Sequence, residues 1–118
     1  MLTREMLENY RAGKKEVAEL RAKMRSAELT AFRSDRPSDR ERALTEQAIY
    51  EACANRQIAR LAQIETEISA IRNPKQRRAL RLRYVDGYSI VKVAMVMGIA
   101  ERTVEYLIQS ALKEKSGG

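Results

Sequence analysis

Apolar residues recur at helical spacing along the first third of the chain. They include Leu7, Tyr10, Val17, Leu20 and Met24, whose intervals place them on one face of a helix. Thr3 is a suitable N-cap for this helix. The pattern fades over residues 31–36, and the polar segment that follows contains Pro37, which predicts a turn.

A second and longer helix is predicted from Asp39 to Arg72. Ser38 and Glu41 have the spacing of a capping box at its start. At about 1.5 Å per residue such a helix is about 50 Å long. Two long helices joined by a short polar turn predict an antiparallel, coiled-coil-like hairpin over residues 1–72. The apolar positions of the second helix include Leu44, Ala48, Ala52, Ile58, Leu61, Ile64, Ile68 and Ile71, the last four in alternating steps of three and four.

These apolar stripes have two interpretations. They form the core of the hairpin, or they share their surface with a second subunit. Gly13 and Ala27 offer little apolar cover to the isoleucine-rich second helix. This imbalance favours a homodimer, with the hairpin as an arm for oligomerisation or for docking a partner.

Three shorter helices are predicted after the hairpin. Asn73 and Pro74 suit the N-cap and first position of one helix, which the turn at Asp86 and Gly87 ends. Ser89 caps the next helix, Gly98 breaks it, and a final helix runs from about Glu101 to Lys113. The predicted fold is therefore all-α, with a second domain at residues 73–118.

Residues 90–109 have the apolar pattern of a helix-turn-helix. Ala94 is small where the second helix must cross closely, and Gly98 can adopt the positive φ of a sharp turn. The alternative is three packed helices that merely share a glycine turn. The predicted helix-turn-helix core is Val93, Ala94, Met97, Gly98, Ile99, Val104 and Leu107.

The positive charge of the chain predicts a polyanionic partner. The chain has a formal net charge of +7, and residues 74–115 hold nine basic and four acidic side chains. Double-stranded DNA is the partner that a basic helix-turn-helix predicts.

The chain has no histidine and one cysteine, which excludes the usual zinc sites and histidine-dependent triads, so we expect no enzyme, metal or cofactor. A single cysteine and the absence of a long apolar run predict a cytoplasmic protein without a membrane segment.

The final helix is the predicted reading element. Arginine can bond guanine, glutamine can read adenine, and glutamate can accept a hydrogen bond from cytosine. Glu101 has a second interpretation, since a carboxylate in the first turn is favoured by the helix dipole. The predicted base-reading residues are Glu101, Arg102, Glu105, Tyr106 and Gln109.

A second set of basic residues is assigned to phosphates. Arg77, Arg78 and Arg81 lie on the preceding helix, which has no base-reading geometry, and Lys92 lies on the first helix of the motif. A solvated basic face is the alternative interpretation.

Residues 77–115 resemble region four of bacterial sigma factors. The similar positions are Leu80–Tyr84, Gly87–Ser89, Val93, Ala94, Met97–Ile99, Glu101–Val104, Ala111 and Leu112. The whole chain, hairpin included, is similar to small phage-encoded sigma-like proteins of the RinA/ArpU group. That resemblance implies regulation of transcription, typically of late phage genes, through promoter DNA and with RNA polymerase as a further candidate partner. The chain departs from this group at Ala100, where Ser or Thr is usual, and in the negative charges of Glu101 and Glu105.

Two other functions fit the same architecture. One is the DNA-recognition subunit of a phage packaging terminase, which also joins a helix-turn-helix to oligomerising helices. The other is a module whose helix-turn-helix binds a protein surface. Oligomer size separates the first from a regulator, because a packaging subunit forms a closed ring of many copies.

Overall fold

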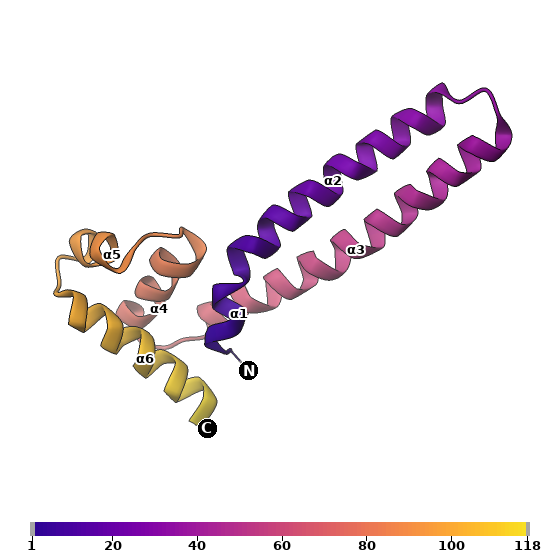
Figure 1. Ribbon diagram of the computed structural model, residues 1–118. Coiled ribbons are helices and arrows are strands. Elements are labelled where there is room, and N and C mark those ends of the chain that lie inside the picture. The colour runs from indigo at the N-terminus through magenta and orange to yellow at the C-terminus, as the bar shows by residue number, and fades with distance from the viewer. Residues whose placement is uncertain (1, 118) are drawn as a thin grey trace. The chain divides into compact units, whose positions relative to one another are not determined.

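The computed structural model describes residues 2–117, with side chains to residue 113 (Figure 1). All regular elements within this range are helices, which confirms the all-α prediction. They are α1 (Arg4–Glu8), α2 (Tyr10–Arg33), α3 (Pro37–Ser69), α4 (Pro74–Leu80), the π-helical η1 (Arg81–Val85), α5 (Ile90–Met97) and α6 (Glu101–Gly117).

The chain divides into two compact units. One contains Met1–Arg11 and Ala62–Gly118, and the other contains Ala12–Leu61. These bounds differ from the predicted division at residue 73, because both ends of the predicted hairpin belong to the unit that holds α4, η1, α5 and α6. The first unit therefore joins the N-terminal residues to the C-terminal helices.

Buried residues at the N-terminus explain this grouping. Leu2 and Tyr10 are fully buried and Leu7 is 1% exposed. The Tyr10 hydroxyl donates a hydrogen bond to Oε1 of Glu65, near the end of the second long helix. Burial, together with the hydrogen bond to Glu65, raises the pKa of the Tyr10 hydroxyl above its usual value.

The predicted first helix is broken into α1 and α2. Thr3 caps α1 as expected, because its hydroxyl accepts a hydrogen bond from the Met6 amide at 3.1 Å. The break falls at Asn9, the C-cap of α1. The apolar spacing runs through this break, which is why the sequence pattern predicts one continuous helix.

The second unit contains most of α2 and α3, which run antiparallel as a hairpin (Figure 1). Gly13 permits the close approach of the two helices, since a Cβ there would lie 2.9 Å from Leu61 Cδ2. Gln57 Nε2 donates to Glu16 Oε2 at 3.0 Å across the same pair. Gly13 thus allows Leu61 to pack closely against the first long helix. The expectation that Gly13 leaves the apolar side of the second helix without cover is wrong.

The first half of α3 differs from the prediction in the residue where the helix begins and in the residues that it buries. The helix begins at Pro37, a residue well suited to a first helical turn, so Ser38 lies inside that turn and is not the N-cap. Three of the apolar positions predicted for this helix, Leu44, Ala48 and Ala52, are exposed. Ala43 and Ala54 are buried instead.

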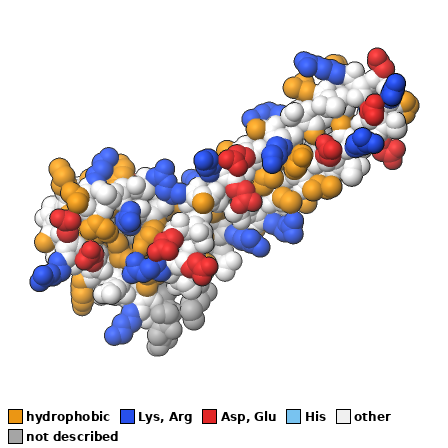
Figure 2. Space-filling model, viewed as in Figure 1, with side chains coloured by type: hydrophobic (Ala, Val, Ile, Leu, Met, Phe, Trp, Pro, Cys, Tyr) orange, Lys and Arg blue, Asp and Glu red, His pale blue; other side chains and the backbone are white. Residues whose placement is uncertain are grey.

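The second half of α3 is covered within the chain. Leu61, Ile64 and Ile68, and Ile71 just after the helix, are each exposed by 9% or less, and Ile58 is half-buried. The shortage of cover that favoured a homodimer is therefore absent. The hairpin surface also carries exposed apolar side chains, and hydrophobic groups are visible on it in Figure 2. The exposed residues include Leu29, Phe32, Leu44 and Ile49.

Candidate nucleic-acid interface

Two capped helices and a left-handed glycine build the C-terminal motif. Asn73 begins α4, its side chain accepting hydrogen bonds from the amides of Lys75 at 2.9 Å and Gln76 at 3.2 Å. Ser89 begins α5 by accepting from the Lys92 amide at 3.1 Å. These contacts confirm both predicted N-caps.

Gly98 makes the turn between α5 and α6. Its φ of +68° is left-handed, as predicted, and the Ile99 amide after it donates to the Ala94 carbonyl at 3.0 Å. This hydrogen bond ends α5, and α6 begins two residues after Ile99, at Glu101. The structure therefore contains the predicted helix-turn-helix.

The core of the motif is largely the predicted one. Val93 and Val104 are fully buried, and Ala94 and Leu107 are 6% and 9% exposed. Met97 and Ile99 are only half-buried, and Gly98 is exposed in the turn. Part of this core was not predicted from the sequence, namely Ala79, Leu80, Ile108 and Ala111, which are 2% exposed or less.

One face of α6 remains free of the core. Successive helix residues are about 100° apart, so Arg102 and Tyr106 lie about 160° either way from Val104. Tyr106 is 66% exposed. All five predicted base-reading residues are exposed, namely Glu101, Arg102, Glu105, Tyr106 and Gln109. A face with hydrogen-bonding groups and no packing role can enter a groove without disturbing the fold.

The predicted phosphate residues fall into two groups. Arg77 Nη1 donates to the Ile71 carbonyl at 2.8 Å, and Arg81 Nη2 donates to Ser69 Oγ at 2.6 Å. Both guanidiniums thus tie the C-terminal helices to the end of α3. Arg78 and Lys92 are exposed, and the Lys92 ammonium lies 4.0 Å from the centre of the Tyr88 ring.

A π-helical segment precedes the turn at Gly87. The Asp86 amide donates to the Arg81 carbonyl at 2.9 Å, five residues back, and Asp86 ends the segment as predicted. Gly87 follows with a φ of +76°. Local propensity carries no clear pattern for this wider turn, so the sequence predicts an ordinary helix there.

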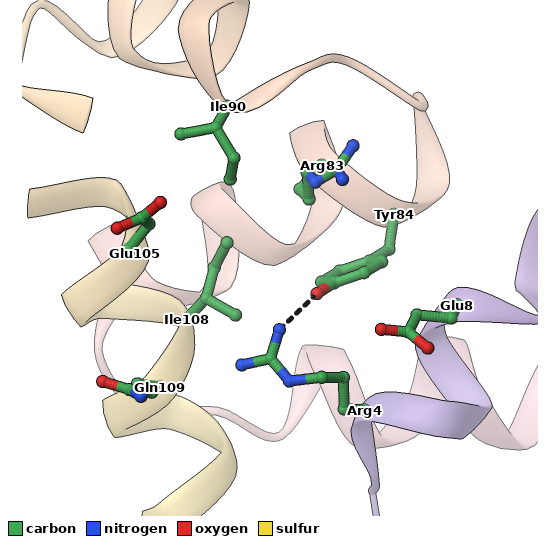
Figure 3. A pocket seen from close by; sticks show the side chains of 8 residues that line it. All are labelled: Arg4, Glu8, Arg83, Tyr84, Ile90, Glu105, Ile108 and Gln109. Carbon is green, nitrogen blue, oxygen red and sulfur yellow. Dashed lines mark hydrogen bonds between the residues drawn. The ribbon is translucent and has the colours of Figure 1, made fainter. Parts of the chain in front are cut away.

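The N-terminal residues add side chains to this region that the sequence analysis missed. Arg4 Nη1 donates to the Tyr84 hydroxyl at 3.2 Å, and Arg11 Nη1 donates to the Asp86 carbonyl at 2.7 Å (Figure 3 shows Arg4). These partners are 80 and 75 residues apart in sequence. Spacing patterns of neighbouring residues cannot reveal such contacts.

A metal site and a membrane-spanning helix are both absent from the part of the chain that the structure describes. Among the side chains of residues 2–113, Cys, Asp and Glu form no cluster that could hold a metal ion. In the same part of the chain, none of the helices combines the length and apolarity that crossing a membrane requires.

Comparison with known proteins assigns the C-terminal segment to a domain type. Residues 73–114 match the family model described as sigma-70, region 4. The matched segment covers α4, η1, α5 and most of α6, a little over a third of the chain. No curated protein and no solved structure matches the chain. The resemblance of this segment to region four is thereby confirmed, and the segment is a sigma region-four-like helix-turn-helix.

Proposed function

We propose that this protein is a sequence-specific DNA-binding regulator of transcription whose α6 enters the major groove. The observation that carries the proposal is the helix-turn-helix itself, in which Val104 and Leu107 are buried while Arg102 and Tyr106 face outward. An α-helix of about 10–12 Å diameter fits the major groove of B-DNA. The match of residues 73–114 to sigma-70 region 4 supports the same function.

The proposed readers of sequence are the exposed residues of α6. Arg102 has the bidentate geometry for guanine, and Gln109 can pair with adenine. Glu101 and Glu105 repel phosphates but can accept a hydrogen bond from cytosine, so they favour a correct site over random DNA. Tyr106 supplies an apolar ring for a thymine methyl group.

Arg78 and Lys92 are the most accessible of the proposed phosphate contacts. Both are exposed, and the structure gives them no hydrogen bond that DNA would have to break. Arg77 and Arg81 donate to Ile71 and Ser69. We therefore assign Arg77 and Arg81 a positioning role in addition to the phosphate contact, because one hydrogen bond leaves a guanidinium most of its N–H donors.

Further proposals concern partners and origin. We infer a homodimer that pairs through the hairpin, supported by the exposed apolar residues Leu29, Phe32, Leu44 and Ile49. Pairing two reading helices would raise the affinity for a two-part site. The resemblance and the composition support three more proposals. RNA polymerase is a partner, the protein belongs to the phage RinA/ArpU group, and it is located in the cytoplasm.

Binding-site selection tests the proposed function. The purified full-length chain is mixed with random duplexes, the bound fraction is amplified over several rounds, and the recovered DNA is sequenced. We expect a common sequence motif that the protein binds at least ~10³-fold more tightly than scrambled DNA. Recovery of unrelated sequences, or failure to retain duplex DNA, would refute sequence-specific binding.

A further inference from the structure

A pocket of about 330 Å³ lies beside α6 in the unit that contains the helix-turn-helix (Figure 3). One wall comes from α6 and includes Glu105 and Gln109, two of the proposed base-reading residues. Another wall comes from α1, which lies outside the segment that matches region four. The lining residues are Arg4, Glu8, Arg83, Tyr84, Ile90, Glu105, Ile108 and Gln109.

Arg4 is held in this pocket by its surroundings. Leu2 and Leu7 on either side of it in sequence are buried, which fixes α1 against the unit. One guanidinium nitrogen donates to the hydroxyl of Tyr84, a residue only 8% exposed. Figure 3 shows the guanidinium between this hydroxyl and α6. This bond uses one of the five N–H donors of the guanidinium, so most of its hydrogen-bonding capacity remains.

A DNA backbone is the partner that this position fits. A helix in the major groove has phosphates along both edges, so cationic side chains that flank the reading helix meet them. Arginine suits a phosphate because its planar donors can bond two oxygens. We propose that Arg4 binds a backbone phosphate of duplex DNA and so extends the interface beyond the region-four-like segment. This inference rests on the proposed function, with α6 as the reading helix.

Glu8 gives the inference a second consequence of opposite sign. It lines the same pocket and lies one helical turn after Arg4. A carboxylate beside a bound phosphate opposes binding. Replacing Glu8 with Gln should therefore strengthen DNA binding, whereas replacing Arg4 with Gln should weaken it.

The experiment measures binding of full-length variants to mixed-sequence duplex DNA at several salt concentrations. Two unit charges about 4 Å apart in water interact strongly enough to change Kd roughly fivefold. We expect Arg4→Gln to raise Kd by about that factor and to lower the slope of log K against log salt by about one. Arg4→Lys should keep the wild-type slope. Glu8→Gln should lower Kd, a gain that loss of folding could not produce.

Two controls separate the charge from other effects. Arg25→Gln removes one positive charge from an exposed position on the hairpin unit and should leave the salt slope unchanged. Tyr84→Phe removes the hydrogen bond to Arg4 but keeps the guanidinium, and should leave Kd within about twofold. If the wild type binds DNA and Arg4→Gln has the same Kd and slope, the inference is overturned while the proposed function stands. If the wild type binds no duplex DNA, the proposed function fails, and the inference fails with it.

Discussion

The turn at Gly87 offers a sharp test of how the N-terminal residues support the reading unit. Gly87 has a φ of +76°, and a Cβ at this position would lie 1.5 Å from Arg11 Nη1. That nitrogen donates to the Asp86 carbonyl at 2.7 Å. Alanine at residue 87 must therefore displace Arg11. Gly98 has a similar φ of +68°, but a Cβ there would meet nothing within 4 Å, so it is a matched control.

The two substitutions should lower the free energy of unfolding by different amounts, and the difference should equal the contribution of the Arg11 hydrogen bond. Forcing a non-glycine residue into the left-handed region costs about 1 kcal/mol, so Gly98→Ala should lower the free energy of unfolding by about that amount. Gly87→Ala carries the same backbone cost. It also loses a charge-assisted hydrogen bond, worth about 1 kcal/mol at an exposed position. Its total cost should be about 2 kcal/mol.

Urea unfolding followed by far-ultraviolet circular dichroism measures these values in the full-length chain. A double-mutant cycle with Arg11→Ala isolates the contact, because Gly87→Ala has no guanidinium to displace in that background. We expect the two substitutions to be non-additive by about 1 kcal/mol. Additivity within about 0.3 kcal/mol, or equal costs for Gly87→Ala and Gly98→Ala, would show that the Arg11 contact contributes nothing.

Three other predictions concern the core, the buried tyrosine and the hairpin surface. Ala94→Leu should destabilise the helix-turn-helix by about 1–3 kcal/mol through overpacking and abolish DNA binding, whereas an unchanged melting temperature with unchanged binding would disprove the close helix crossing. Because the pKa of Tyr10 is raised in the folded state, its stabilising effect is complete below the unfolded value of 10.0 and declines above it. Tyr10→Phe should cost about 1 kcal/mol at neutral pH and should soften the alkaline decline, and identical pH profiles of unfolding for both chains would refute this. Phe32→Asp should dissociate the proposed dimer in sedimentation experiments, and a wild type that is strictly monomeric would refute the dimer, while a closed ring of many copies would favour the packaging function.

Local features of the C-terminal half were predictable from the sequence. Asn73 and Ser89 cap helices because their side chains satisfy free amides a few residues ahead, and Gly98 turns because it tolerates a positive φ. Each effect involves residues within one turn of each other. The sequence therefore locates α4, α5 and the turn, and the region-four resemblance follows from the same residues.

The face that α3 buries was harder to predict. Alanine is abundant in its first half, and it fits equally well at a buried or an exposed position. Leu44, Ala48 and Ala52 form one plausible stripe, but the helix buries the side that contains Ala43 and Ala54. Periodicity alone cannot choose between two stripes of similar apolarity.

Long-range polar contacts were beyond prediction for a different reason. Arg4 and Arg11 look like ordinary surface arginines in sequence, yet their partners Tyr84 and Asp86 lie 80 and 75 residues away. Arg77 likewise donates to the Ile71 carbonyl, a contact that its place in the sequence does not reveal. Which basic residues remain free for DNA depends on the packing of all the helices.

The most direct test of α6 as the reading helix is a titration of variants against a selected site and its scrambled version at several salt concentrations. Arg102→Ala and Gln109→Ala should each weaken the selected site by about 1–3 kcal/mol and leave scrambled DNA nearly unaffected. Arg78→Gln and Lys92→Gln should weaken both duplexes alike and lower the salt slope by about one each. Helical circular dichroism confirms that each variant is folded. Full discrimination by Arg102→Ala and Gln109→Ala would contradict the account and exclude α6 as the element that reads the sequence.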